Sequence, residues 1–158
     1  MQTHITIEDG QVRAMLGKLA GRLGNLAPVM RNIGEIVRTS IERNFEAGGR
    51  PDKWPLSGRV KNEGGQTLSD TARLRRSFTV RGYPDRAEVG TNDIKAAIHQ
   101  LGGIIRAKNK PFLKFKIGNQ WVQKKEVRIP ARPFLMVQDE DWPKMTQYLG
   151  KYFIEGTV

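Results

Sequence analysis

The chain has 158 residues and a formal net charge of +11, from 27 lysines and arginines against 16 aspartates and glutamates. This length suits one domain that can bury a core, and the absence of cysteine excludes disulfides, thiolate metal sites and cysteine nucleophiles. No apolar run or basic leader predicts a membrane span or a signal peptide, so we expect a soluble, cytoplasmic chain with no membrane partner.

The N-terminal part, residues 1–47, is predicted to be mainly helical. Weak alternation of apolar and polar residues over 3–8 favours a short strand. Asp9 is the expected N-cap of a first helix, which ends near Arg22 and is weakened by three glycines.

A longer helix is predicted from about Pro28, which suits a first helical turn, to Gly48-Gly49, which suits a helix end. Its apolar residues recur three and four apart, as on a helix that covers a core, and glutamates and arginines occupy the opposite face. The apolar stripe comprises Val29, Met30, Ile33, Ile36, Val37, Ser40, Ile41 and Phe45.

A loop is predicted over residues 48–67, because glycine, proline, aspartate and serine dominate this stretch. Trp54 and Leu56 are its expected anchors. The next region, residues 68–135, is predicted to be the β-rich core. It begins with a short helical turn that Ser69 or Asp70 caps.

Two strands are predicted over residues 77–82 and 86–91, on either side of a turn at Tyr83-Pro84-Asp85. A short helix over 94–101 follows and is stopped by Gly102-Gly103.

A basic hairpin is predicted over residues 104–128. Its strands, 112–117 and 120–129, flank Gly118-Asn119, which is a two-residue hairpin signal. Two-residue turns join antiparallel strands, so the sheet should be antiparallel and the fold class α+β.

The C-terminal part, residues 136–158, is predicted to hold one helix from about Glu140 to Phe153. Its apolar stripe comprises Trp142, Met145, Tyr148, Leu149 and Tyr152. With this helix the chain forms a single domain, residues 1–158.

Most of the net positive charge lies in residues 101–132, which hold nine bases and one acid, whereas residues 133–158 carry a net charge of −2. The bases are Arg106, Lys108, Lys110, Lys114, Lys116, Lys124, Lys125, Arg128 and Arg132. Two interpretations stay open. The segment is either a surface for a polyanion or a solvated hairpin whose lysines prevent pairing at its edges.

The hairpin also carries an aromatic residue among its lysines. A two-residue turn places Lys116 opposite Trp121, so that one face presents Lys114, Lys116, Trp121 and Lys125. Lysines around an aromatic ring can contact phosphates and stack a base. No known nucleic-acid motif accompanies them, which favours non-specific contact over sequence recognition.

Catalytic motifs are absent from the sequence. The two histidines, His4 and His99, are far apart in the chain, and no zinc-protease motif or phosphate-binding loop occurs. The acidic residues 139–141 precede a predicted helix, whose dipole favours negative charge at that end. We therefore expect no enzyme, no cofactor and no metal site.

Three blocks of residues occur in an order that resembles a known family. They are FEAGGRPDKWPLS (45–57), LSDTARLRRSF (68–78) followed by EVGT (88–91) and AAIHQLGG (96–103), and IPARPFL (129–135). Over roughly residues 26–154 the chain resembles the phage virion-morphogenesis family, also called the tail-completion family, of Mu-like phages and prophages. Two departures are visible: Ala72 stands where glycine is usual, and Leu101 where phenylalanine is usual.

The resemblance implies a structural virion protein, without enzymatic activity, at the junction of head and tail. Tail completion, tail termination and neck connection are the implied roles. The implied fold is a small antiparallel β-barrel or sandwich with helices. The implied partners are further copies in a ring, expected to be a hexamer, and other neck, connector and tail proteins. The charge of the basic hairpin adds one of two expected partners, packaged DNA through non-specific contact or an acidic neighbouring ring. The alternative function is a free-standing, non-specific nucleic-acid-binding protein.

The residues of the family blocks are expected in structural or subunit-facing roles. They are Leu68, Arg73, Leu74, Arg75, Arg76, His99, Gly102, Gly103, Pro130, Arg132, Pro133, Phe134 and Leu135. The two prolines should hold an extended segment, because proline disfavours the helical conformation of the residue before it. That segment should deliver Phe134 and Leu135 as buried anchors, and Arg132 should bind either a neighbour's carboxylate or a local carbonyl.

Overall fold

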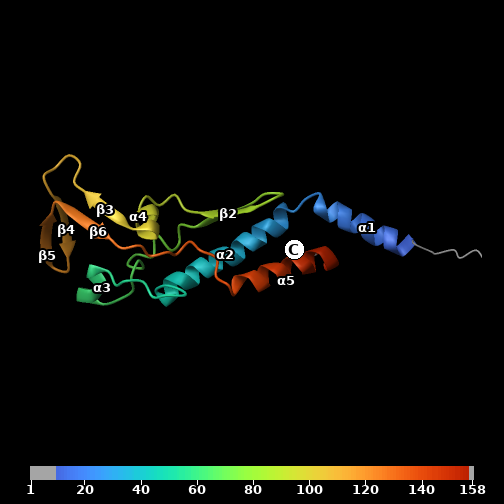
Figure 1. Cartoon of the computed structure of the whole chain (residues 1–158), viewed down its shortest axis with the longest axis horizontal. Coiled ribbons are helices and arrows are strands. Elements are labelled where there is room, and N and C mark those ends of the chain that lie inside the picture. Colours follow the sequence, from blue (N-terminus) through green and yellow to red (C-terminus); the bar gives the residue numbers. More distant parts are fainter. Residues whose placement is uncertain (1–9, 157–158) are drawn as a thin grey trace, which may run out of the picture.

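The long helix α2 (Ala27–Ala47) is the axis of the structure, a computed structural model that describes residues 10–156 and their side chains from residue 13 onward. Figure 1 shows an elongated molecule in which α5 (Asp141–Glu155) lies along one side of α2. The hairpin of β1 (Thr79–Gly82) and β2 (Ala87–Gly90) lies along another side. None of the described helices is long and apolar enough to cross a membrane.

Helix α2 confirms the predicted helix and its ends. Pro28 lies in the first turn, and Gly48 ends the helix with a φ of 67°, which a residue without Cβ adopts at little cost. The apolar stripe buries Val29, Ile41 and Phe45 completely. On the opposite face Arg38 lies 2.7 Å from both Glu35 and Glu42, as the spacing predicts.

Helix α1 (Gly10–Leu23) extends beyond the N-terminal end of α2 (Figure 1). Its C-terminal end is joined to that of α5, where Arg22 donates hydrogen bonds to the carbonyl oxygens of Phe153 and Ile154. Met15, Leu16 and Leu23 remain exposed along the helix. The helix confirms the prediction for this segment, while the predicted strand over residues 3–8 and the Asp9 cap lie outside the described residues.

The remaining elements form the other end of the molecule. They are α3 (Gly58–Glu63), α4 (Ala96–Leu101), β3 (Gly103–Arg106), β4 (Leu113–Ile117), β5 (Gln120–Lys124) and β6 (Glu126–Ile129). Three antiparallel sheets result, β1–β2, β3–β6 and β4–β5, which confirms the predicted α+β class. Each described sheet has two strands and none closes, so the implied barrel or sandwich is not seen in residues 10–156.

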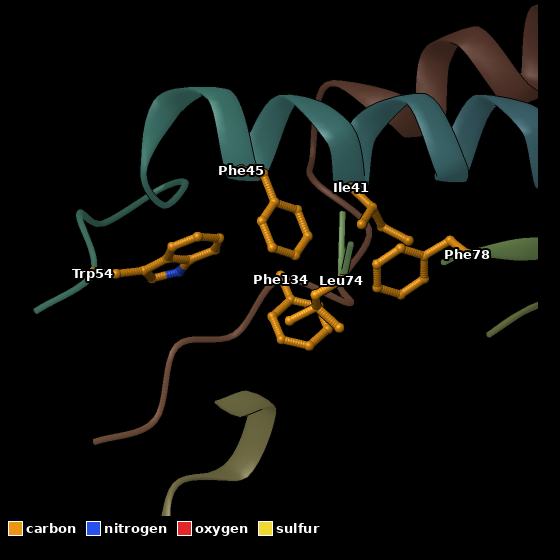
Figure 2. Packing of buried hydrophobic residues seen from close by; sticks show 6 residues of the cluster. All are labelled: Ile41, Phe45, Trp54, Leu74, Phe78 and Phe134. Carbon is orange, nitrogen blue, oxygen red and sulfur yellow. The ribbon is translucent and has the colours of Figure 1, made fainter. Parts of the chain in front are cut away.

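The hydrophobic core lies where α2 ends (Figure 2). Ile41 and Phe45 of α2 pack there with Trp54, Leu74, Phe78 and Phe134. The ring centroids of Phe45 and Phe134 are 5.1 Å apart, and Trp54 meets Phe45 edge-on at 5.5 Å. These are favourable separations for aromatic pairs, so four segments distant in sequence are held by one aromatic cluster.

Some predicted anchors are placed differently. Trp54 is buried as expected, but Leu56 is 56% exposed, and the predicted loop contains helix α3, whose N-terminus Ser57 caps through its hydroxyl. Trp142, which is predicted in the apolar stripe of the last helix, is 59% exposed. It lies in the first turn of α5, before Met145 and Tyr152, the buried apolar residues of a helix that packs along α2.

Residues 72–76 form the predicted short helical turn, in which the Ala72 carbonyl oxygen accepts from the Arg76 amide at 3.0 Å, and Ala72 has a φ of 54°. This left-handed conformation is costly for any residue with a Cβ atom. We expect Ala72→Gly to raise the free energy of unfolding by roughly 0.5–1 kcal/mol, measured by urea denaturation. Ala97→Gly, in helix α4, should lower it by up to about 1 kcal/mol. If both variants changed the free energy of unfolding by the same amount in the same direction, backbone strain at Ala72 would be contradicted.

Candidate functional site

The predicted basic hairpin forms a two-part arm, here called the basic arm and defined as residues 103–129. Its base is the β3–β6 pair and its tip is the β4–β5 hairpin, which lies at the end of the molecule away from α5 (Figure 1). Gly118 has a φ of 60° and is the only residue of the turn with positive φ, as in a type II′ turn. The predicted second strand is interrupted at Lys125, where β5 leaves β4 and β6 joins β3.

All eight bases of the basic arm are exposed. Arg106 and Arg128 belong to the base, Lys108 and Lys110 to the connecting loop, and Lys114, Lys116, Lys124 and Lys125 to the tip and its end. Glu126, the single acid of the arm, lies 3.0 Å from Arg106. The remaining cations therefore give the arm a strongly positive surface.

Trp121 lies on the cationic face of the tip, as predicted. It pairs with Lys116, and the Nζ atom of Lys114 lies 5.1 Å from its ring centroid. Lys125 is also predicted on the Trp121 face. It follows the last paired residue of β5, Lys124, so the pairing of β4 with β5 does not put it on that face. The exposed Trp121 ring and the two lysines form one continuous patch.

The family-block segment 130–135 runs extended beside the core, as its prolines predict. Phe134 is only 1% exposed, and its neighbour Pro133 accepts a hydrogen bond from the indole of Trp54 at 3.0 Å. The side-chain oxygen of Gln100 accepts hydrogen bonds from the backbone amides of Phe134 and Leu135, both at 2.9 Å. Leu135 itself is exposed and is not the buried anchor that was expected.

Arg132 binds a carbonyl oxygen of its own chain, which is one of the two contacts expected for it. Its side chain is buried, and its Nε donates a hydrogen bond to the carbonyl oxygen of Pro55 at 2.8 Å. Burial lowers the pKa of Arg132 below its ordinary value, although an arginine stays charged at any physiological pH. In the described part of the chain no carboxylate pairs with it, so the residue ties the 130–135 segment to the loop before α3.

His99 is joined to the same segment, because its carbonyl oxygen accepts a hydrogen bond from the backbone amide of Arg132 at 2.8 Å. Burial, with the positive charges of Arg132 and Lys95, lowers the pKa of His99 below its ordinary value. The nearby carboxylate of Asp93 acts in the opposite direction but does not outweigh them. The Nδ1 atom of His99 is buried without a hydrogen-bond partner in the structure.

The other block residues also have structural surroundings. Leu74 belongs to the core and Leu68 packs against it. Arg75 pairs with Glu46 at 2.5 Å, Arg73 lies 3.6 Å from Asp93, and Arg76 is exposed. A Cβ atom at Gly102 would lie 2.7 Å from the backbone nitrogen of Ala131, so Gly102 lets α4 end against the 130–135 segment, and Gly103 begins β3.

A polar cluster that the sequence did not predict lies behind the core. Arg50 donates from Nε to Asn44 at 2.9 Å and from Nη2 to the backbone carbonyl of Ser40 at 2.9 Å. Gln138 donates to the same Asn44 oxygen at 3.1 Å, and Asn44 donates to the Phe134 carbonyl at 2.8 Å. The one sequence signal for this cluster is that Ser40 and Asn44 are polar residues within or beside the apolar stripe of α2.

Asp141 completes this cluster at the start of α5. It accepts a hydrogen bond from the backbone amide of Gln138 at 3.0 Å. Burial acts to raise its pKa, but hydrogen bonds from Ser40 and Gln138 and the charge of Lys144 outweigh burial and keep the pKa below its usual value. The acid therefore has a structural role, as the helix-dipole argument predicted. In residues 10–156 no group of three acidic, histidine or cysteine side chains could hold a metal ion.

Comparison with known proteins adds to this picture. A model of the phage virion morphogenesis family matches residues 7–153. The chain is 35% identical over 150 residues to "Mu-like prophage FluMu G protein 2" of Haemophilus influenzae, and the alignment covers 94% of each protein. No solved structure is similar enough to count as a match.

Proposed function

The chain belongs to the phage virion morphogenesis family, and we propose that it is a structural virion protein that acts where head and tail meet. The family match over nearly the whole chain is the observation that carries this proposal. The role is tail completion, as a tail terminator or a neck connector, without enzymatic activity. The protein would work in the host cytoplasm during assembly and remain at the neck or tail end of the virion.

Further copies of the chain are the first partners that we propose, arranged in a ring with a hexamer as the expected form. Rings form when one surface of a subunit meets a different surface of the next. The elongated molecule offers such different surfaces, since its basic arm and its acidic C-terminal part lie apart (Figure 1). Other neck, connector and tail proteins would then contact the faces of the ring.

A phage that lacks this chain tests the proposal. We expect negative-stain electron microscopy of lysates to show separate heads and tails, and expression of the wild-type chain in trans to restore joined particles. Joined, infectious virions in the absence of the chain would refute a role at the junction.

The lysines of the basic arm should matter for this role. A chain with Lys114, Lys116, Lys124 and Lys125 replaced by glutamine is expected to restore infectious particles on the order of tenfold less well than wild type, because long-range charge attraction to the arm's partner is lost. The matched control replaces Lys18, Lys53, Lys61 and Lys151, which are exposed and lie outside the basic arm, by glutamine and should complement normally. Equal complementation by both variants would mean that the arm is only a solvated hairpin.

The second candidate function is non-specific nucleic-acid binding, which the exposed cations around Trp121 favour. It predicts a gel shift with duplex DNA that weakens steeply as salt rises, because bound counterions are released from the phosphates. Such a shift at physiological salt, in a protein whose deletion leaves heads and tails joined, would favour this function over the first.

A further inference from the structure

The basic arm has no buried residue of its own. None of residues 103–129 is buried, although the arm carries Ile104, Ile105, Phe112 and Trp121 as large apolar side chains. Trp121 is the most exposed of them at 66%. Apolar and cationic groups that share an exposed surface are typical of a segment that packs against a protein. Duplex DNA keeps its base faces stacked inside the helix, so it would cover the cations and leave these apolar side chains in water.

The tip presents one well-defined face to such a partner. In the β4–β5 register, Lys116 lies opposite Trp121 and Lys114 lies opposite Gln123, so these four side chains share one side of the hairpin. Lys124 pairs with Leu113 and lies on the other side. A partner of the first face needs an apolar surface for the indole ring and carboxylates for the two lysines.

A surface with that chemistry exists on the same chain. A hollow of about 520 Å³ lies between residues 50–51 and residues 136–140, and we call it the acidic hollow. Pro51, Met136 and Val137 supply its apolar lining, and Asp139 and Glu140 its carboxylates. Arg50 and Gln138 complete the lining, so one cation faces two carboxylates and the hollow keeps a net negative charge.

The two carboxylates of the acidic hollow differ in whether they already have a partner within the chain. Glu140 lies 2.6 Å from Arg50, whereas Asp139 has no hydrogen bond or ion pair to any described residue. Trp142, which is exposed, lies two residues after Glu140 in the first turn of α5. Asp139 therefore keeps its charge available to a cation from outside the chain.

We propose that the Trp121 face of the basic arm of one copy docks in the acidic hollow of a neighbouring copy. Trp121 then contacts the apolar lining, and Lys114 and Lys116 approach Asp139 and Glu140. Because the tip lies at the end of the molecule away from α5 (Figure 1), the two surfaces serve two different neighbours, and the contact is heterologous. The inference rests on the proposed function, for which it supplies the contact that builds the ring.

The absence of native cysteine allows a direct test by disulfide formation. One chain carries Gln123→Cys, on the Trp121 face, and a second carries Met136→Cys, in the acidic hollow. After mixing and mild oxidation we expect a cross-linked pair of one chain of each kind. Lys124→Cys, on the opposite side of β5, is the matched control and should cross-link to Met136→Cys roughly tenfold less, because a disulfide needs closely spaced Cβ atoms.

Charge reversal provides the second measurement. Lys114→Glu with Lys116→Glu in one chain, or Asp139→Lys in another, should each weaken self-association in light scattering on the order of tenfold, with unchanged thermal unfolding. A mixture of the two reversed chains should associate again, because every arm then meets a hollow of opposite charge. Failure of the mixture to associate would overturn the proposal.

The outcomes separate this inference from the proposed function. Oligomers of the purified chain without the Gln123–Met136 cross-link overturn the contact and leave the proposed function intact. Joined virions in the absence of the chain refute the proposed function, even where the cross-link forms. Binding of duplex DNA by wild type and Asp139→Lys alike, with no cross-link, overturns the contact in favour of a polyanion.

Discussion

Replacing Phe134 by alanine is expected to lower the free energy of unfolding by roughly 3–5 kcal/mol. Its ring lies 5.1 Å from that of Phe45, 5.7 Å from Phe78 and 6.5 Å from Trp54, and is 1% exposed. Truncation removes the contacts that join these rings and leaves a cavity. Because a domain is typically stable by only about 5–15 kcal/mol, this loss removes a large part of the free energy of unfolding.

Urea denaturation measures this loss, with Phe112→Ala as the matched control. Phe112 lies in the basic arm and is exposed, so the same chemical change should cost no more than about 1 kcal/mol. If both variants unfolded at the same urea concentration, the aromatic cluster would not be the centre of stability. Because Phe134→Ala acts on the whole fold, it should also abolish complementation of the deleted phage.

Replacing Arg50 by alanine should have the next largest effect, a loss of roughly 2–4 kcal/mol. Its guanidinium group donates to Asn44, to the backbone and hydroxyl oxygens of Ser40 and to Glu140. Asn44 and Ser40 are buried, so water cannot replace the lost donor, although the Asn44 oxygen keeps its hydrogen bond from Gln138. Hydrogen bonds from a charged donor are stronger than those between neutral groups, so losing several of them together is costly.

Two further variants show which part of the Arg50 cluster carries this energy. Glu140→Gln removes the ion pair with Arg50 but acts at an exposed carboxylate, so the loss should stay below about 1 kcal/mol. Arg50→Lys keeps the positive charge but loses the planar guanidinium group with its several donors. Its loss of free energy of unfolding should lie between those of Glu140→Gln and Arg50→Ala. If Glu140→Gln lowered the free energy of unfolding as much as Arg50→Ala does, the stabilisation would come from the surface ion pair and not from the buried hydrogen bonds.

Much of the fold follows from patterns that are local in the sequence. Helix α2 could be bounded from Pro28 and Gly48, and the register of Lys116 with Trp121 from a two-residue turn. Each of these depends on residues within a few positions of one another. The family blocks also indicated a virion protein without any knowledge of tertiary structure.

Other features depend on distant contacts and could not be predicted in this way. The Arg50 cluster joins residues about 90 positions apart, such as Asn44 and Phe134, and no periodicity marks it. The break at Lys125 arises because β6 pairs with β3 rather than continuing along β4. The exposure of Leu56 and Leu135 likewise depends on which neighbours reach them.

Helix α1 has a consequence for how the molecule loses its structure. An isolated helix of this length is only marginally stable in water, and Arg22 holds the C-terminal end of α1 against the end of α5. With Met15, Leu16 and Leu23 in solvent, opening α1 exposes little apolar area that was covered before. We therefore expect the amide hydrogens of α1 to exchange at a lower opening free energy than those of α2.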